Sequence, residues 1–452
     1  MKNTLGAAWI LGLLLLAISP ARSFAQPQPS VPRPDDRYKA DILLIVAHPD
    51  DDTGASTYLS KAVLDEHKRV AVIFTNRGSS GPNAVGMEQS KALADVREME
   101  ARRSLAARGV TNVWFLNGLD TPTQDVLHSL EVLGHGAALE EVVRLIRLTR
   151  PEVVLTWMPA YVAGENHGDH QAAGVIATEA FDLAADTTAF PEQVTPPRAR
   201  KGISNYGEGL LPWQPKKLYF FSDASHPEFF KGHGPVYLAS DTSTEKKTSF
   251  AELNRRAWAL YATQLDFNDQ VLRYYTDMPE IFVLGKSLVA APVEGDVWAG
   301  INEHPAVFQS VTRRWAERQP GLSIELGGPW AFYRDFYEAH GLSNLETLVP
   351  PQSALSSDRQ LWIPLLLRNT SSIAARISLA AGLPPGWKEF TGTGTYDLGP
   401  GQTYPVQVFL EAPPEASNPK SPQLLQWTGT SGDRAVGKVE LSVYLEFDGV
   451  PQ

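Results

Sequence analysis

The stretch LLIVAHPDDD at residues 43–52 decides the fold of the N-terminal half of the chain. Its apolar part suits a buried strand, because strands covered on both faces of a parallel sheet have continuous runs of Val, Ile and Leu. The run ends in His48 and the carboxylates Asp50, Asp51 and Asp52. Packing a strand needs none of these charges, and open α/β sheets bind ligands beyond the carboxyl ends of their strands. The stretch therefore predicts a metal site with a proton-transferring carboxylate after a first strand.

Strand and helix patterns alternate along the residues that follow. Strands are expected at 41–47, 70–75, 112–116, 153–157 and 217–222, and helices at 55–67, 88–108, 137–149 and 250–263. Strands that alternate with helices indicate βαβ units and a mostly parallel sheet with right-handed crossovers. A further helix is expected to begin just after His170 and to end near Ala184.

A second polar cluster, ENHGDH at residues 165–170, follows the strand expected at 153–157. Both clusters then lie on the same edge of the sheet. A single Asp or His in a loop is more often a turn residue or a helix cap, and Asp50 or Asp52 taken alone can be read in that way. Two such clusters after two strands of one domain favour a site.

The residue types of the two clusters limit the chemistry. On a tight turn, His48 and Asp51 can face one ion, while Asp50 stands beside it and can take a proton from a water. Catalytic zinc typically has three protein ligands and a water, so the second cluster must supply the third ligand. The chain has no cysteine, and any metal site must therefore use nitrogen and oxygen ligands.

The bulk composition is that of a globular protein. The 452 residues suggest two or three domains of roughly 150 to 200 residues each. The formal net charge of -11 gives no electrostatic case for nucleic acid or an anionic membrane as partner. The oligomeric state has no signature in the sequence.

The N-terminus has the pattern of a secretory signal. Lys2 supplies the positive charge, residues 5–18 the apolar run, and residues 23–25 a cleavage site before Gln26. The run is shorter than the roughly 20 residues of a membrane span, so we expect cleavage and no span afterwards. Loss of Lys2 and Arg22 would change the net charge from -11 to -13.

The pattern changes after Pro350 and Pro351. Short β-type runs at 361–367, 374–380, 404–410 and 436–447 are separated by Gly/Pro turns, which predicts an all-β sandwich. We therefore divide the chain into a signal peptide (1–25), a Pro/Gln-rich leader (26–39), an α/β domain (40–290), a connector or annex (291–350) and a sandwich (351–452).

The two clusters together resemble the PIG-L/LmbE-like family of zinc-dependent de-N-acetylases. The resemblance rests on AHPDDD at 47–52 and HGDH at 167–170, with TNRG at 75–78 and Thr263-Gln264 as further matches, and it covers roughly residues 40 to 290. It implies a Rossmann-like three-layer α/β fold, an N-acetylglucosamine conjugate as substrate, and an exported bacterial protein in the periplasm or outside the cell.

The resemblance also implies roles for individual residues. His48, Asp51 and His170 would bind Zn²⁺, although this ligand set also suits Fe²⁺ or Co²⁺. Asp50 would be the general base, and His167 would stabilise the oxyanion or protonate the leaving amine. The remaining roles are sugar contacts for Arg97 and Asp120, and support of the metal ligands from behind for Asp52 and Asp169.

The chain departs from the family pattern at several positions. Asp52 stands where Glu is usual, Gly168 where proline is common, Glu165 where some members have a catalytic tyrosine, and Tyr261 where histidine is frequent. Tyr161 lies further back and is a candidate to replace that tyrosine. None of these changes removes a predicted metal ligand or the base.

The C-terminal part resembles β-sandwich accessory modules of secreted bacterial glycosidases, on turn motifs such as LPPGW at 383–387. Trp387 and Trp427 are expected in its core, with stacking on sugar rings as the alternative.

The sequence therefore predicts an exported N-deacetylase that acts on an amino sugar. The alternatives are an amidase that removes a larger acyl group and a protein that only binds glycan. A pure binding protein would be expected to lack Asp50 or a metal ligand, and the chain retains them.

Overall fold

The computed structural model describes residues 35–162, 167–195, 207–223, 227–265, 273, 276–301, 320–355, 359–414 and 422–444. The predicted signal peptide, residues 26–34 of the leader, Glu165 and the end of the last predicted strand lie outside these residues. Within the described residues, each helix is too short or too polar to cross a bilayer.

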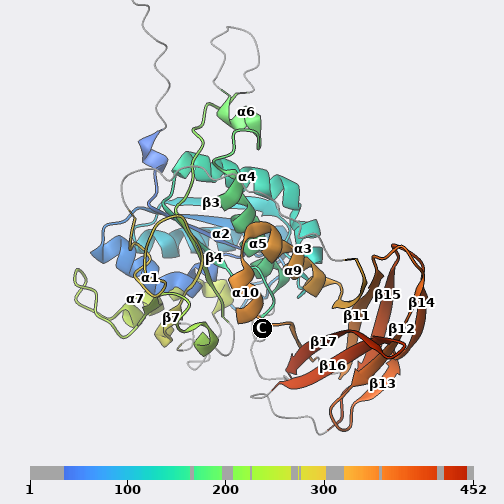
Figure 1. The fold of residues 1–452 in the computed structure, drawn as a ribbon. Coiled ribbons are helices and arrows are strands. Elements are labelled where there is room, and N and C mark those ends of the chain that lie inside the picture. Colours follow the sequence, from blue (N-terminus) through green and yellow to red (C-terminus); the bar gives the residue numbers. More distant parts are fainter. Residues whose placement is uncertain are drawn as a thin grey trace, which may run out of the picture. The chain divides into compact units, whose positions relative to one another are not determined.

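The first domain is an α/β domain around one mostly parallel sheet (Figure 1). Its strand order is β3-β2-β1-β4-β5-β8, in which β1 to β5 are parallel and β8 is antiparallel to β5. The strands are β1 (Ile42–Val46), β2 (Val70–Asn76), β3 (Asn112–Gly118), β4 (Val153–Trp157), β5 (Lys217–Phe221) and β8 (Val283–Ser287), with the small pair β6 (Val236–Tyr237) and β7 (Glu280–Ile281) beside them.

Helices cover both faces of this sheet. They are α1 (Ser56–Ser60), α2 (Ser90–Ala107), α3 (Val126–Leu133), α4 (His135–Thr149), α5 (Gly168–Leu183), α6 (Pro191–Val194), α7 (Phe250–Trp258), α9 (Pro329–His340) and α10 (Ser343–Leu348). Alternate residues of β1 enter two separate cores. Leu43 packs with residues of α3, α4, α5 and α9, whereas Leu44 packs with residues of α1, α2 and α7. The predicted three-layer fold is confirmed.

Two predicted helices differ from the structure. The helix expected at 55–67 is a 3₁₀ turn (Asp51–Ala55), then α1, then a π-helical turn (Lys61–Asp65). The helix expected after His170 begins earlier, at Gly168, because the His167 ring caps it by accepting a hydrogen bond from the Asp169 amide. His170 therefore lies on the first turn of α5.

The C-terminal residues form the predicted β-sandwich. One sheet has the order β10-β17-β16-β12-β14 and the other β13-β15-β11-β9. The strands are β9 (Leu322–Leu326), β10 (Gln352–Ala354), β11 (Gln360–Asn369), β12 (Ala375–Gly382), β13 (Lys388–Thr391), β14 (Gly394–Leu398), β15 (Thr403–Glu411), β16 (Gln423–Ser431) and β17 (Arg434–Tyr444).

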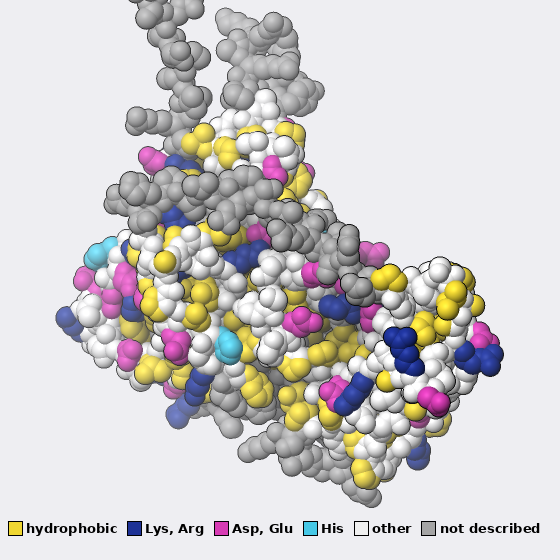
Figure 2. Space-filling view, in the orientation of Figure 1, with side chains coloured by type: hydrophobic (Ala, Val, Ile, Leu, Met, Phe, Trp, Pro, Cys, Tyr) yellow, Lys and Arg dark blue, Asp and Glu magenta, His cyan; other side chains and the backbone are white. Residues whose placement is uncertain are grey.

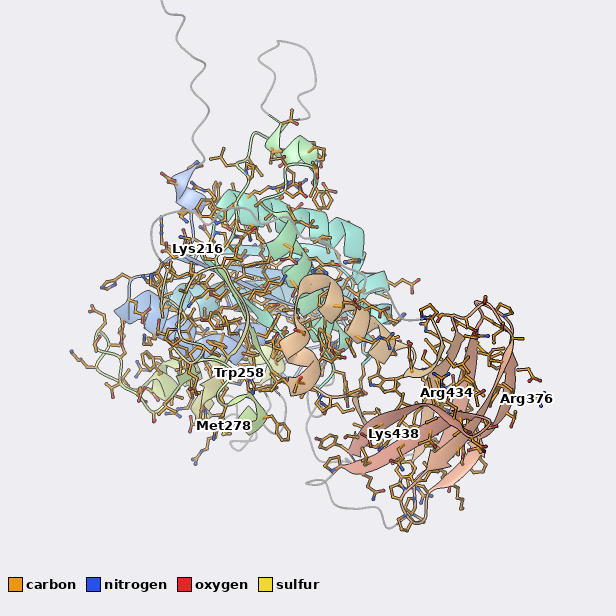
Figure 3. The ribbon with its side chains drawn as sticks, in the orientation of Figure 1. Lys216, Trp258, Met278, Arg376, Arg434 and Lys438 are labelled. Atoms are coloured by element: carbon orange, nitrogen blue, oxygen red, sulfur yellow. The ribbon has the colours of Figure 1, made fainter. Side chains whose placement is uncertain are left out.

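The interior of the sandwich is apolar. Trp387 and Trp427 lie in the core, 8% and 0% exposed, as expected. Arg376, Arg434 and Lys438 are exposed on its strands (Figure 3). Basic and acidic side chains are interspersed on the face that Figure 2 shows.

The region predicted as a connector or annex contributes to both parts. Its strand β9 pairs antiparallel to β11 of the sandwich. Its helices α9 and α10 contribute Tyr333, Phe336 and Leu345 to the core of the α/β domain.

Candidate active site

The predicted site residues come together at the carboxyl edge of the α/β sheet. His48, Asp50 and Asp51 follow β1, and Asp120 follows β3. His167 and His170 lie at the start of α5, which follows β4. Gly174 lets α5 pack closely on the end of β4, since a Cβ at this position would meet the Trp157 carbonyl oxygen.

Three of these residues present ligand atoms to one point. His170 Nε2 lies 3.2 Å from His48 Nδ1 and 3.2 Å from Asp51 Oδ1, and His48 Nδ1 lies 3.5 Å from Asp51 Oδ1. A tetrahedral ion with bonds of about 2.0 to 2.1 Å keeps neighbouring ligand atoms about 3.3 to 3.4 Å apart. The triangle therefore fits a small divalent cation.

Hydrogen bonds hold the Asp51 ligand in place. Asp51 Oδ2 accepts from the Ala47 and His48 amides, both at 2.9 Å, and from Trp157 Nε1 at 2.7 Å. These bonds leave Oδ1 facing the two histidines. The Trp157 ring also stacks on His170 at 4.2 Å and 5° between planes. One tryptophan thus orients two of the three ligands.

The charges of the triangle are strongly coupled. Burial alone would disfavour the ionised Asp51, but the nearby His170 and His48 hold the pKa of Asp51 well below its usual value. Burial also opposes the charged form of His48, but Asp51, together with Asp120 and Asp169, raises the pKa of His48 well above the usual value. The site is thus a buried carboxylate matched to positive charge, which a cation can supply by replacing protons.

Asp50 lies beside the triangle and has a different electrostatic environment. Burial and the neighbouring charge of Asp51 raise the pKa of Asp50 to about 8. Positive charges around it, Arg97 first, oppose this shift. A carboxylate with a pKa near neutrality is suited to take and return a proton, because general acid–base catalysis is most efficient when the pKa lies near the working pH.

His167 lies beside His48, with the two ring centroids 4.4 Å apart. Burial, together with His48 and His170, lowers the pKa of His167 to about 4. Its Nδ1 accepts from the Asp169 amide at 3.3 Å, which places the proton of the neutral ring on Nε2. His167 is thus suited to donate a hydrogen bond as a neutral imidazole.

Asp169 and Asp120 flank His48 Nε2, at 3.4 Å and 3.3 Å. Asp169 is fully buried and accepts from the Thr121 amide at 3.0 Å, the Thr121 hydroxyl at 2.7 Å and Asn76 Nδ2 at 3.1 Å. Its position behind His48 fits the supporting role that the sequence predicts. Nitrogen and oxygen atoms of His48, Asp120, His167 and Asp169 that could act as metal ligands also lie close enough together to hold a cation.

Asp52 faces away from the triangle, into a buried network. Its carboxylate accepts from Arg108 Nη1 at 2.7 Å and from the Tyr261 hydroxyl, and Arg108 Nη2 donates to Ser56 at 2.8 Å. Burial raises the pKa of Asp52, although the nearby positive charge of Arg108 opposes this shift. The two departures from the family pattern, Asp52 and Tyr261, are therefore partners.

The two predicted sugar-binding residues hold the loop after β2. Arg97 is 4% exposed and donates to the carbonyls of Gly78 at 2.9 Å and Pro82 at 2.8 Å. Asp120 Oδ2 accepts from the Ser80 amide at 2.7 Å. Contact of Arg97 and Asp120 with a sugar stays a prediction.

Sequence reasoning missed the roles of Trp157 and Arg108. Trp157 ends a predicted strand, and its position before the second cluster is a signal that it lies at the site. Arg108 ends α2 and gives no such signal. A cavity of about 350 Å³ lies beside Tyr161, the candidate to replace the family's tyrosine, and Trp330, Tyr333 and Arg334. None of the predicted metal ligands lines it, nor does Asp50 or His167.

The fold and the site define an α/β domain with a His/Asp cluster that could hold a metal ion, and comparison with known proteins shows which family this domain matches. Residues 43–181 match the PIG-L family, described as GlcNAc-PI de-N-acetylase. These residues are a PIG-L domain, as the resemblance implied.

The relatives include deacetylases and an amidase. The chain is 28% identical over 187 residues to a 1D-myo-inositol 2-acetamido-2-deoxy-alpha-D-glucopyranoside deacetylase of Catenulispora acidiphila, which covers 38% of this chain and only 57% of the relative. It is 25% identical over 305 residues to the mycothiol S-conjugate amidase of Streptomyces coelicolor. This alignment covers 58% of this chain and 98% of the amidase. The N,N'-diacetylchitobiose deacetylase structure from Pyrococcus horikoshii aligns at 18% identity and a TM-score of 0.39. This alignment covers 55% of this chain and 85% of the deacetylase.

Proposed function

We propose that this protein is a metal-dependent hydrolase that removes the acetyl group from an N-acetylglucosamine-type sugar or conjugate. The triangle of His48, Asp51 and His170, with Asp50 beside it, carries this proposal. The deacetylases among the relatives support it. His₂Asp ligation favours Zn²⁺ and also suits Fe²⁺ or Co²⁺.

The bound metal would supply two things that an unreactive acetamide needs, a water of lowered pKa and a polarised carbonyl. The side chains of this chain handle the protons. Asp50 takes the proton of the attacking water and passes it to the leaving nitrogen. His167 Nε2 donates a hydrogen bond to the carbonyl oxygen as its charge develops.

Asp50→Asn tests this assignment. The amide keeps the size of the side chain and cannot accept the proton, so we expect kcat to fall about 10²- to 10⁴-fold. Acetate release from N-acetylglucosamine and its glycosides gives the rate, and elemental analysis gives the metal content. A variant with wild-type turnover, or a metal-loaded wild type that releases no acetate from any of these sugars, would refute the proposal.

A larger acyl group is the second candidate, and the alignment with the mycothiol S-conjugate amidase along almost its whole length favours it. A panel of N-acyl glucosamines of increasing chain length separates the two activities. Preference for acetyl supports the deacetylase, and preference for a bulky acyl group supports the amidase.

We also propose that the protein is exported, to the periplasm or beyond the cell. The pattern at residues 1–25 supports this. N-terminal sequencing of the mature protein should begin at Gln26, and an intact N-terminus would contradict cleavage.

A further inference from the structure

Helix α9 lies alongside α5 and is bonded to it near both ends (Figure 1). The Tyr333 hydroxyl donates to Gln171 Oε1 on the first turn of α5. The His340 ring bonds to Asp182 on the last turn of α5, with 2.7 Å between Nδ1 and Oδ2. Phe336 packs between these contacts, in the same core as the apolar face of α5. The segment that bears α9 lies outside the residues that match the PIG-L family.

Gln171 links this helix to the candidate site. It directly follows His170 and is fully buried. Its Nε2 donates to the carbonyl of His167 at 3.4 Å and to that of Gln124 at 3.3 Å. Because Tyr333 binds Oε1, the amide can turn only its Nε2 toward the turn that bears the two histidines. Tyr333 therefore sets the orientation of the amide behind them.

A neighbouring tyrosine shows that packing alone does not require this hydroxyl. Tyr337 lies one turn further along α9 and is 4% exposed, against 7% for Tyr333. Among the described residues, none forms a hydrogen bond with the Tyr337 hydroxyl. The two rings contribute to the same apolar core. They differ because the Tyr333 hydroxyl is bonded to Gln171 on the first turn of α5, and the Tyr337 hydroxyl is not.

We propose that Tyr333 is a positioning residue of the active site, which acts through Gln171 on the turn that carries His167 and His170. This inference rests on the proposed function. Supporting partners of metal ligands typically change metal affinity or activity by about 10- to 100-fold when they are removed.

Tyr333→Phe tests the inference, and Tyr337→Phe is its matched control. We expect Tyr333→Phe to lower kcat about tenfold, with KM changed less than about twofold, because a positioned donor acts on the reaction and not on sugar binding. Tyr337→Phe should keep wild-type kcat. Thermal unfolding of each variant checks that the fold persists. Equal kcat values in the two variants would overturn the inference.

A double-mutant cycle tests the route through Gln171. Gln171→Met keeps the volume and removes both ends of the amide, so Tyr333→Phe should have no further effect on kcat in that background. An undiminished tenfold effect would show that Tyr333 does not act through Gln171.

The visible spectrum of the Co²⁺-loaded protein gives a readout without turnover. Tyr333→Phe should change the bands that report on ligand geometry, and Tyr337→Phe should leave them as in the wild type. If the wild type released no acetate, the proposed function would fail while this spectral comparison still decided the positioning role. Identical spectra for all three proteins would refute that role.

Discussion

The carboxyl edge of the α/β sheet buries Asp51, Asp52, Asp169 and Arg108, whereas the core of the β-sandwich is built from aliphatic side chains around Trp427. Burial of charge costs free energy unless each group is paired and hydrogen-bonded, and a core of apolar residues is the cheaper way to hold a domain together.

The difference separates the roles of the two regions. At the sheet edge, the hydrogen bonds to Asp51 Oδ2 leave Asp51 Oδ1 facing His48 and His170. In the sandwich, the buried Asn369 amide donates to the Ile373 carbonyl at 2.7 Å and to that of Gly399 at 3.0 Å, and so fastens two turns. Buried polar groups therefore orient candidate metal ligands in the first region, and they hold two turns of the chain together in the second.

Asp51→Ala should have the largest effect on the first region, on both metal binding and activity. It removes one ligand and leaves Trp157 Nε1 and two backbone amides without their acceptor. We expect bound metal to fall to background and acetate release to become undetectable, while the far-UV circular dichroism spectrum stays native. Elemental analysis after gel filtration gives the metal content. Retention of one equivalent of metal would contradict the ligand assignment.

Trp427→Ala should have the converse effect. Its side chain is fully buried in the sandwich, so its loss should cost about 3 to 5 kcal/mol of the free energy of unfolding. The kcat of the folded protein should be unchanged, because the metal triangle belongs to the other region. Trp362→Ala, at a position 55% exposed, is the matched control and should change stability little. Urea unfolding and acetate release measure both quantities, and a Trp427→Ala variant with lowered kcat would show that the regions are coupled.

Apolar runs made the central strands predictable. The strand expected at 153–157 has the bounds of β4, and that expected at 41–47 differs from β1 by one residue at each end. Both are buried along their length, so the local pattern carries the full signal. The start of α5 was wrong because a histidine caps it, and histidine is not among the usual N-cap residues.

The supporting contacts outside the two clusters could not be predicted. Asp52 and Arg108 are 56 residues apart, and Tyr333 and Gln171 are 162 apart. Such pairs leave no periodicity in the sequence, whereas the ligands His48 and Asp51 share a motif. The motif thus predicts a set of metal ligands, and the residues that orient these side chains became visible only in the fold.

The smallest expected effect concerns a pair far from the metal triangle. His135, at the start of α4, bonds to Glu179 of α5, and this bond raises the pKa of His135 above its usual value against the effect of burial. A raised folded-state pKa stabilises the protein below the unfolded value of about 6.5, and the effect is lost as the pH rises through the folded-state pKa.

The His135 side chain is 37% exposed, so solvent screening limits the effect to about 0.2 to 1 kcal/mol. His135→Gln should therefore lower the free energy of unfolding at pH 5.5 and match the wild type at pH 9, as measured by urea unfolding. His128→Gln, at an exposed histidine of α3, controls for loss of a surface imidazole. A deficit of His135→Gln that is equal at both pH values would show that packing, and not the charge of the imidazole, links α4 to α5 at this position.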